Sequence, residues 1–203
     1  MKRIDLRRDF RDLYRPSALE IEMVRIPKLQ YLMIDGEGSP NSGEGFPQAV
    51  QALYVTAYTL KFMLKNEMKV DFPVMALEGL WWAKHPEAFR LKRWDDWRWT
   101  LMIMQPGLVT KTHLKKALTL AIEKKGLPEL RRVRLESFTE GLALQLMHVG
   151  PYDKEGPAID RLHSFAAERK LKLVGKHHEI YLSDPRRVNP AKMKTILRHP
   201  VRK

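Results

Sequence analysis

The sequence predicts an α+β fold made of tandem β-α-β-β repeats, with a ligand groove between two antiparallel sheets. Two observations carry this prediction. Strand-like and helix-like stretches occur twice in the same order, and one further amphipathic stretch separates the two copies. Each copy alone has a small sheet with a helix on one face, so pairing the copies buries the helical sides and leaves a concave region between the sheets.

The first copy is expected to span about residues 20–108. Its helix is predicted by Val50, Leu53, Ala57, Leu60 and Leu64, which recur with gaps of three and four and form one apolar stripe. The Gly-, Ser- and Pro-rich stretch 35–46 before this helix is expected to be an irregular loop. The expected elements are strands at 21–34, 73–83 and 97–104 and a helix at 47–67.

The second copy is expected to span about residues 129–200 and to repeat this order. A helix at about 111–125, ended by Gly126 and Pro128, should join the copies within a single domain of residues 1–203. Alignment by order and spacing places Gly36 beside Gly150 and Glu78 beside Glu179. The expected elements are strands at 131–137, 141–149, 178–183 and 193–199 and a helix at 154–170.

The composition restricts the kind of protein. Cys is absent, which excludes disulfides and thiolate metal sites and fits a reducing, cytoplasmic setting. The basic N-terminus is followed by no apolar run, so no secretory signal and no membrane segment are expected. The net charge of +13 is spread along the chain, so we expect solvated basic faces, with non-specific contact to polyanions as an open alternative.

Five sequence motifs resemble the GyrI-like small-molecule-binding proteins: HVGPYDKE at 148–155, HHEIYLSDP at 177–185, DGEG at 35–38, ALYVTAYTLKF at 52–62 and LEGLWWA at 77–83. The resemblance covers about residues 20–200. The resemblance implies a ligand groove at a pseudo-twofold axis. The motif LEGLWW is similar to the one in stand-alone members of the family. Some of these are similar to multidrug-binding proteins, and others to hydrolases that open the cyclopropane of DNA-alkylating natural products. Only about 20 residues precede the matching region, so a helix-turn-helix and sequence-specific DNA binding are not expected.

Two carboxylates are the leading candidates for chemistry. Glu179 and Tyr181 are two residues apart in a predicted strand, so their side chains share a face. Glu78 occupies the aligned position in the first copy. A carboxylate facing an apolar groove needs a cationic or hydrogen-bonding partner, and burial raises its pKa toward the range useful for acid or base catalysis. We therefore expect Glu179, Glu78 and Tyr181 to face the groove; the alternative is a surface Glu paired with Lys or Arg.

Aromatic residues are the leading candidates for ligand contact. Trp81 and Trp82 must point to opposite faces of one strand, and Trp82 is favoured for the pocket because it shares the phase of Glu78. Trp97 and Trp99 share a face of the next strand and could stack on a flat ligand, although ordinary packing is the alternative. The motif HVGPY adds His148 and Tyr152, and the first helix adds Tyr54 and Tyr58.

The residues leave three functions open. The chain could bind a small hydrophobic or aromatic molecule, hydrolyse a strained electrophilic one with a Glu as acid or base, or contact nucleic acid or protein through its basic surface. No metal site or cofactor is expected, because the seven His lack metal-ligand spacing and the Gly-rich loop matches no phosphate-binding pattern.

Overall fold

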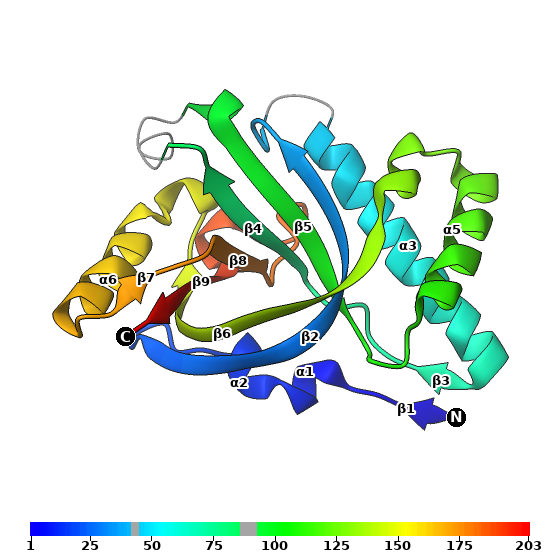
Figure 1. The fold of residues 1–203 in the computed structure, drawn as a ribbon, viewed down its shortest axis with the longest axis horizontal. Helices are drawn as coiled ribbons and strands as arrows, with labels where there is room; N and C mark the ends of the chain where they lie inside the picture. The colour runs from blue at the N-terminus through cyan, green and yellow to red at the C-terminus, as the bar shows by residue number, and fades with distance from the viewer. Residues whose placement is uncertain (42–44, 86–92) are drawn as a thin grey trace.

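The computed structural model describes residues 1–41, 45–85 and 93–203, and it confirms the α+β class (Figure 1). Its main elements follow the order strand, helix, strand, strand in each half. In the first half these are β2 (Glu22–Glu37), α3 (Gly45–Met68), β4 (Leu77–Ala83) and β5 (Trp97–Gln105). In the second half they are β6 (Arg134–Val149), α6 (Gly156–Glu168), β8 (His177–Tyr181) and β9 (Lys194–Arg202).

Shorter elements connect the two halves and precede the first. The linking helix α5 (Lys111–Lys125) has the predicted bounds and ends at Gly126, which adopts the left-handed conformation that glycine tolerates. The remaining elements are β1 (Lys2–Arg3), α1 (Leu6–Asp9), α2 (Arg11–Tyr14), β3 (Val70–Asp71), η1 (Trp94–Asp96), η2 (Pro128–Arg132), η3 (Tyr152–Lys154), β7 (Lys172–Leu173) and η4 (Pro190–Lys192).

The strands of both halves join one sheet, which differs from the expected pair of sheets. The seven-stranded sheet has the order β6-β2-β5-β4-β8-β9-β7, and β6 also pairs with β9. This extra pairing closes β6, β2, β5, β4, β8 and β9 into a ring, visible in Figure 1 as strands curving round a common centre. The two halves meet at the antiparallel pair β4–β8, where Gly79 lies opposite Glu179 and Glu78 lies opposite Ile180.

Both long helices cover the same face of this sheet. Phe46 of α3 packs against Trp81 and Trp99, and Leu162 of α6 packs in a buried cluster with Leu197 of β9. The helices cover different ends of the sheet in Figure 1, with α3 beside β2 and β5 and α6 on the other side. Between α3 and α6, part of the surface of β4 and β8 is therefore covered by neither helix.

Several strands differ from the expected bounds; β4 begins at Leu77 and not at 73, and β9 ends at Arg202 and not at 199. The expected strands 131–137 and 141–149 form one continuous strand, β6, in which Gly141 has a positive φ of 79°. The strand β2 extends to Glu37, into the expected irregular loop, of which residues 42–44 lie outside the described part of the chain. This extension is possible because Gly36 lies opposite Trp99, and only a residue without a side chain leaves room for the indole ring.

Candidate functional site

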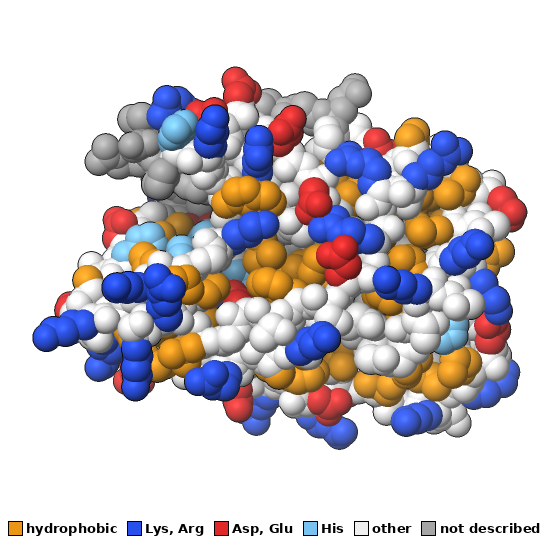
Figure 2. Space-filling view, in the orientation of Figure 1, with side chains coloured by type: hydrophobic (Ala, Val, Ile, Leu, Met, Phe, Trp, Pro, Cys, Tyr) orange, Lys and Arg blue, Asp and Glu red, His pale blue; other side chains and the backbone are white. Residues whose placement is uncertain are grey.

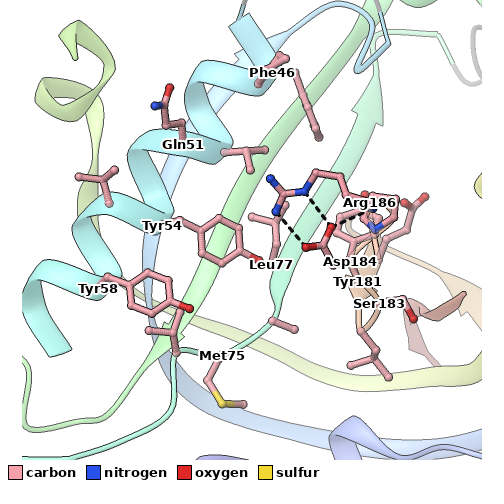
Figure 3. A pocket seen from close by; sticks show the side chains of 18 of the residues that line it. Phe46, Gln51, Tyr54, Tyr58, Met75, Leu77, Tyr181, Ser183, Asp184 and Arg186 are labelled. Atoms are coloured by element: carbon pink, nitrogen blue, oxygen red, sulfur yellow. Dashed lines mark hydrogen bonds and ion pairs between the residues drawn. The ribbon is translucent and has the colours of Figure 1, made fainter. Parts of the chain in front are cut away.

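A groove of about 2560 Å³ lies over the exposed stretch of β4 and β8. One wall is α3, with Tyr54 and Tyr58, and the other is the loop after β8, with Asp184 and Arg186 (Figure 3). The beginning of α6 and the short turn before it close one end, and Arg7 and Tyr14 of the N-terminal segment contribute at the other. The groove is thus built from both halves of the chain.

Hydrogen bonds link three side chains on the floor of the groove. The Trp81 indole Nε1–H donates to the Tyr181 hydroxyl oxygen at 2.9 Å, and the Tyr181 hydroxyl donates to Glu179 Oε2 at 2.7 Å. Burial, together with the charge of Glu179, holds the pKa of Tyr181 well above its ordinary value, so the hydroxyl keeps its proton. Glu179 is therefore held by a donor that stays a donor across the physiological pH range.

A second carboxyl, that of Glu155, lies beside this group. Glu155 is the residue before α6, it is buried, and it lines the groove with Glu179. Burial, followed by the negative charge of Glu179, raises the pKa of Glu155 to about 9. At neutral pH Glu155 therefore keeps its proton, so this part of the groove holds a carboxylic acid that could donate a proton.

Aromatic rings line much of the rest of the groove. Tyr54, Tyr58 and Phe62 stack along α3, with ring centroids 6.5 and 6.2 Å apart. Tyr58 and Phe62 are about half exposed, so their faces are open to the groove. On the opposite side, Tyr152 packs edge-on against Tyr181 at 5.5 Å, and its pKa is raised to about 12 by burial and by the charge of Glu155.

Comparisons with known proteins identify the family of this chain. The family model of the GyrI-like small molecule binding domain matches residues 19–202, which is nearly the whole chain. The chain belongs to the GyrI-like family. A search of curated proteins finds no match.

Three solved GyrI-like neighbours come from Listeria innocua, and each is covered over its full length. An uncharacterized conserved protein is 42% identical, with a TM-score of 0.91 over 98% of this chain. One protein described as a hydrolase is 41% identical, with a TM-score of 0.89 over 99% of the chain. Another described as a hydrolase is 39% identical, with a TM-score of 0.86 over 98% of the chain.

Seven of the eleven candidate residues lie in the groove of this GyrI-like chain, and their roles there stay predictions. These seven residues are Glu179, Tyr181, Trp81, Trp97, Tyr152, Tyr54 and Tyr58. Trp97 stands edge-on to Trp81, with ring centroids 5.7 Å apart. Glu155 is a further groove residue that the sequence analysis missed, although it is the last residue of the motif at 148–155.

Glu78 was expected in the groove, and it lies on the opposite face of the sheet. It is fully buried, accepts a hydrogen bond of 2.5 Å from the Tyr14 hydroxyl and lies 3.0 Å from His178 Nε2. The His178 Nδ1 atom lies 3.1 Å from Glu140, whose other oxygen accepts from Arg198 at 3.2 Å. We call these five residues, Tyr14, Glu78, Glu140, His178 and Arg198, the buried polar cluster. Glu78 belongs to this cluster and cannot reach a ligand in the groove.

The other three candidates also lie away from the groove. Trp82 is on the face of Glu78, where the Lys176 ammonium sits 3.2 Å from its ring centroid. Trp99 is buried under α3 against Phe46 and Gly36. His148 is buried at the turn before α6, with its Nε2 atom 3.2 Å from the Pro151 carbonyl oxygen, so it fixes the turn. Trp82 was favoured for the pocket, and the sheet register shows that this was wrong.

Within residues 1–41, 45–85 and 93–203, no three His, Asp or Glu side chains are placed to hold a metal ion. None of the described helices is long and apolar enough to cross a bilayer. Basic side chains on the face in Figure 2 are scattered among acidic and apolar ones and form no continuous basic patch there.

Proposed function

We propose that the groove binds flat, largely apolar molecules that are neutral or carry one positive charge. The observation that carries this proposal is a carboxyl group, that of Glu179, held by Tyr181 on the floor of a groove with aromatic walls. Rings such as Tyr54 and Tyr58 offer apolar surface to a planar ligand and attract a cation to their faces. On the floor of the groove Glu179 supplies a negative charge that such a cation would neutralise, while the neighbouring Glu155 is neutral at pH 7.

Ligand binding tests this proposal directly. Trp81 and Trp97 line the groove, so a bound planar ligand should quench tryptophan fluorescence. Ethidium serves as the cationic probe and phenanthridine as its neutral counterpart. Glu179→Gln should weaken ethidium binding by about tenfold, or ~1.4 kcal/mol, and leave phenanthridine binding nearly unchanged. The matched control is Glu136→Gln, which removes a half-exposed acid paired with Arg134 on β6, away from the groove. Equal losses for both probes, or no quenching by either, would contradict the proposal.

A second candidate function is hydrolysis of strained electrophiles, such as cyclopropane-bearing alkylators. The observation that favours it is a second carboxyl group, that of Glu155, which lines the groove with Glu179 and keeps its proton at neutral pH. Two of the neighbouring structures, at 39% and 41% identity, are also described as hydrolases. In this reaction Glu179 would take a proton from water while the water oxygen bonds to the ring carbon. The carbon–carbon bond of the ring would break toward the conjugated carbonyl, whose oxygen would take the proton of Glu155, so that one water is added overall.

Turnover distinguishes the two candidates. A hydrolase should add water to a cyclopropane-bearing alkylator, seen as a mass increase of the ligand, and both Glu155→Gln and Glu179→Gln should slow this at least ~100-fold. A pure binder would retain the intact ligand in wild type and variants alike. Either activity would suit capture or detoxification of xenobiotics, and the Cys-free composition leads us to place it in the cytoplasm.

A further inference from the structure

Gly79 is the residue of β4 that lies directly opposite Glu179 on β8. A Cβ atom at Gly79 would lie 2.8 Å from Trp81 Nε1 and 3.2 Å from the Tyr181 hydroxyl oxygen. The first distance is shorter than a carbon and a nitrogen can approach without a bond, and the indole ring has little freedom to move because it is packed between Phe46 and Trp97. The missing side chain at Gly79 therefore makes room for the Trp81–Tyr181 hydrogen bond.

This hydrogen bond has only one direction. An indole Nε1–H can donate but cannot accept, so the Tyr181 oxygen must be the acceptor. The single hydroxyl proton of Tyr181 is then directed away from Trp81, toward Glu179 Oε2 at 2.7 Å. A carboxyl oxygen that accepts this proton is favoured in its ionised form. Trp81 thus influences the protonation of Glu179 through two successive hydrogen bonds.

We propose that Trp81 and Gly79 are positioning residues that assign the acid and base roles in the carboxyl pair. Trp81 fixes the orientation of the Tyr181 hydroxyl, which keeps Glu179 unprotonated and leaves Glu155 as the protonated member of the pair. Gly79 leaves the space in which the two hydrogen bonds, from Trp81 to Tyr181 and from Tyr181 to Glu179, can form. The inference rests on the proposed function of the groove, because it concerns the same two carboxyl groups, and it adds the residues that make them unequal.

The other titratable groups near the two carboxyls do not determine in this way which of the two carries the proton. His177 Nε2 lies 3.3 Å from Glu179 Oε1, but neither ring nitrogen of His177 makes a hydrogen bond to the described residues. Tyr152 packs against Tyr181 through its ring, and Asp184 is bound by Arg186 on the far wall. Tyr181 makes a short, directed hydrogen bond to one member of the pair, Glu179.

The chain also provides a matched control. Trp99 lies opposite Trp81 on β5, on the same face of the sheet, and is equally buried. Its Nε1 atom has no hydrogen-bond partner among the described residues. Trp81→Phe and Trp99→Phe therefore make the same chemical change at neighbouring positions. Only Trp81→Phe removes the hydrogen bond that Tyr181 accepts.

The test is the location of the proton in the ligand-free protein. Carbon-13 NMR of the glutamate carboxyl groups, assigned through Glu155→Gln and Glu179→Gln, distinguishes protonated from ionised side chains. At pH 7 the wild type should show a protonated Glu155 and an ionised Glu179. Trp81→Phe should shift the ratio of the two protonated forms by about fivefold toward Glu179, the effect of weakening one hydrogen bond. Trp99→Phe should leave the ratio as in the wild type.

Two further variants keep the proposal falsifiable if Trp81→Phe is unstable. Tyr181→Phe removes the hydroxyl itself, and Gly79→Ala displaces it, so both should move the proton in the same direction as Trp81→Phe. A carboxyl ratio that stays at the wild-type value in all three variants would overturn the inference. This readout needs no ligand and no turnover, so a failed inference and a failed function are told apart: the fluorescence titration reports on binding and the carboxyl ratio on positioning.

Discussion

Glu78 and Glu179 point to opposite faces of the central strands β4 and β8. In this antiparallel pair Glu179 lies opposite Gly79, and Glu78 lies opposite Ile180, and residues opposite one another share a face. The same two strands therefore present the Glu179 carboxyl group to the groove on one face and contribute to the buried polar cluster on the other. The groove face is accessible from outside the protein, whereas the buried polar cluster connects the two halves of the chain in the interior.

The buried polar cluster should stabilise the fold. Its members come from α2, β4, β6, β8 and β9, so it ties both halves and the N-terminal segment to one point. Glu140→Gln would leave Arg198 and His178 buried with a missing negative charge, so we expect a loss of ~3 kcal/mol in the free energy of unfolding. Urea denaturation measures this loss. The control is Glu136→Gln on the same strand, at an exposed position where a change below ~0.5 kcal/mol is expected; a similar small change for Glu140→Gln would contradict the prediction.

Stability should also fall at alkaline pH because of His178. Burial alone would lower its pKa, but the charges of Glu140 and Glu78 overcome this and raise the pKa to about 9, from 6.5 in an unfolded chain. A group whose pKa is raised on folding contributes stability below its unfolded pKa and loses it as pH rises through the folded one. We expect a loss of ~3 kcal/mol between pH 6.5 and pH 9.

The pH measurement needs a defined background. Glu155, whose pKa is also raised to about 9, would add a slope of the same sign, so urea denaturation should be followed in Glu155→Gln. His178→Gln in that background should remove most of the remaining slope. A slope that persists undiminished in the double variant would assign the pH dependence to another group.

The elements were largely predictable from the sequence, because local patterns determine them. The apolar stripe of α3 and the Gly126–Pro128 stop of α5 are set by neighbouring residues, and the structure has these helices within two residues of the predicted bounds. Closure of the strands into one ring was not predictable, because it depends on the pairing of β6 with β9, whose partners are about 50 residues apart. Hydrophobic periodicity contains no information on such long-range pairing.

The face of each site residue was predictable only within one strand. Glu179 and Tyr181 share a face because they are two residues apart, and the structure places both in the groove. Glu78 was assigned by aligning the two halves, and an alignment in error by one residue moves a strand side chain to the other face. Trp82 followed Glu78 in phase and was therefore misplaced with it, while its neighbour Trp81 lies in the groove.

Gly36 should be sensitive to the smallest substitution. A Cβ atom at this position would lie 2.1 Å from the Trp99 ring, which is buried under α3 and cannot move aside. Gly36→Ala should therefore destabilise the fold by about 3 kcal/mol, as expected for overpacking at a rigid site. Thermal and urea denaturation measure the change. Gly107→Ala is the matched control, since a Cβ atom there meets nothing within 4 Å; equal effects of the two substitutions would show that Trp99 does not confine Gly36.

The aromatic wall should contribute more to large planar ligands than to small ones. Tyr58 and Phe62 line the groove and are 48% and 53% exposed; Tyr58 stacks on Tyr54, and Phe62 stacks on Tyr58. Phe62→Ala should weaken ethidium by about three- to tenfold, from the loss of one aromatic contact. A single-ring cation such as benzyltrimethylammonium, bound near Glu179, should be unaffected. Loss of affinity for both ligands would indicate that Phe62 shapes the whole groove.

The pH dependence of turnover would identify the acid if the chain is a hydrolase. Glu155 has a pKa of about 9, so its acid form is present at neutral pH and disappears above pH 9. The wild-type kcat/KM should therefore be level up to about pH 8 and fall about tenfold per pH unit above pH 9. Glu155→Gln should lower the rate by about 100-fold or more and abolish this alkaline fall, because glutamine has no proton to lose. Tyr152, with a pKa of about 12, titrates too high to produce the same profile. An alkaline fall that survives in Glu155→Gln would assign the acid to another residue, and Tyr181→Phe would then be the next variant to measure.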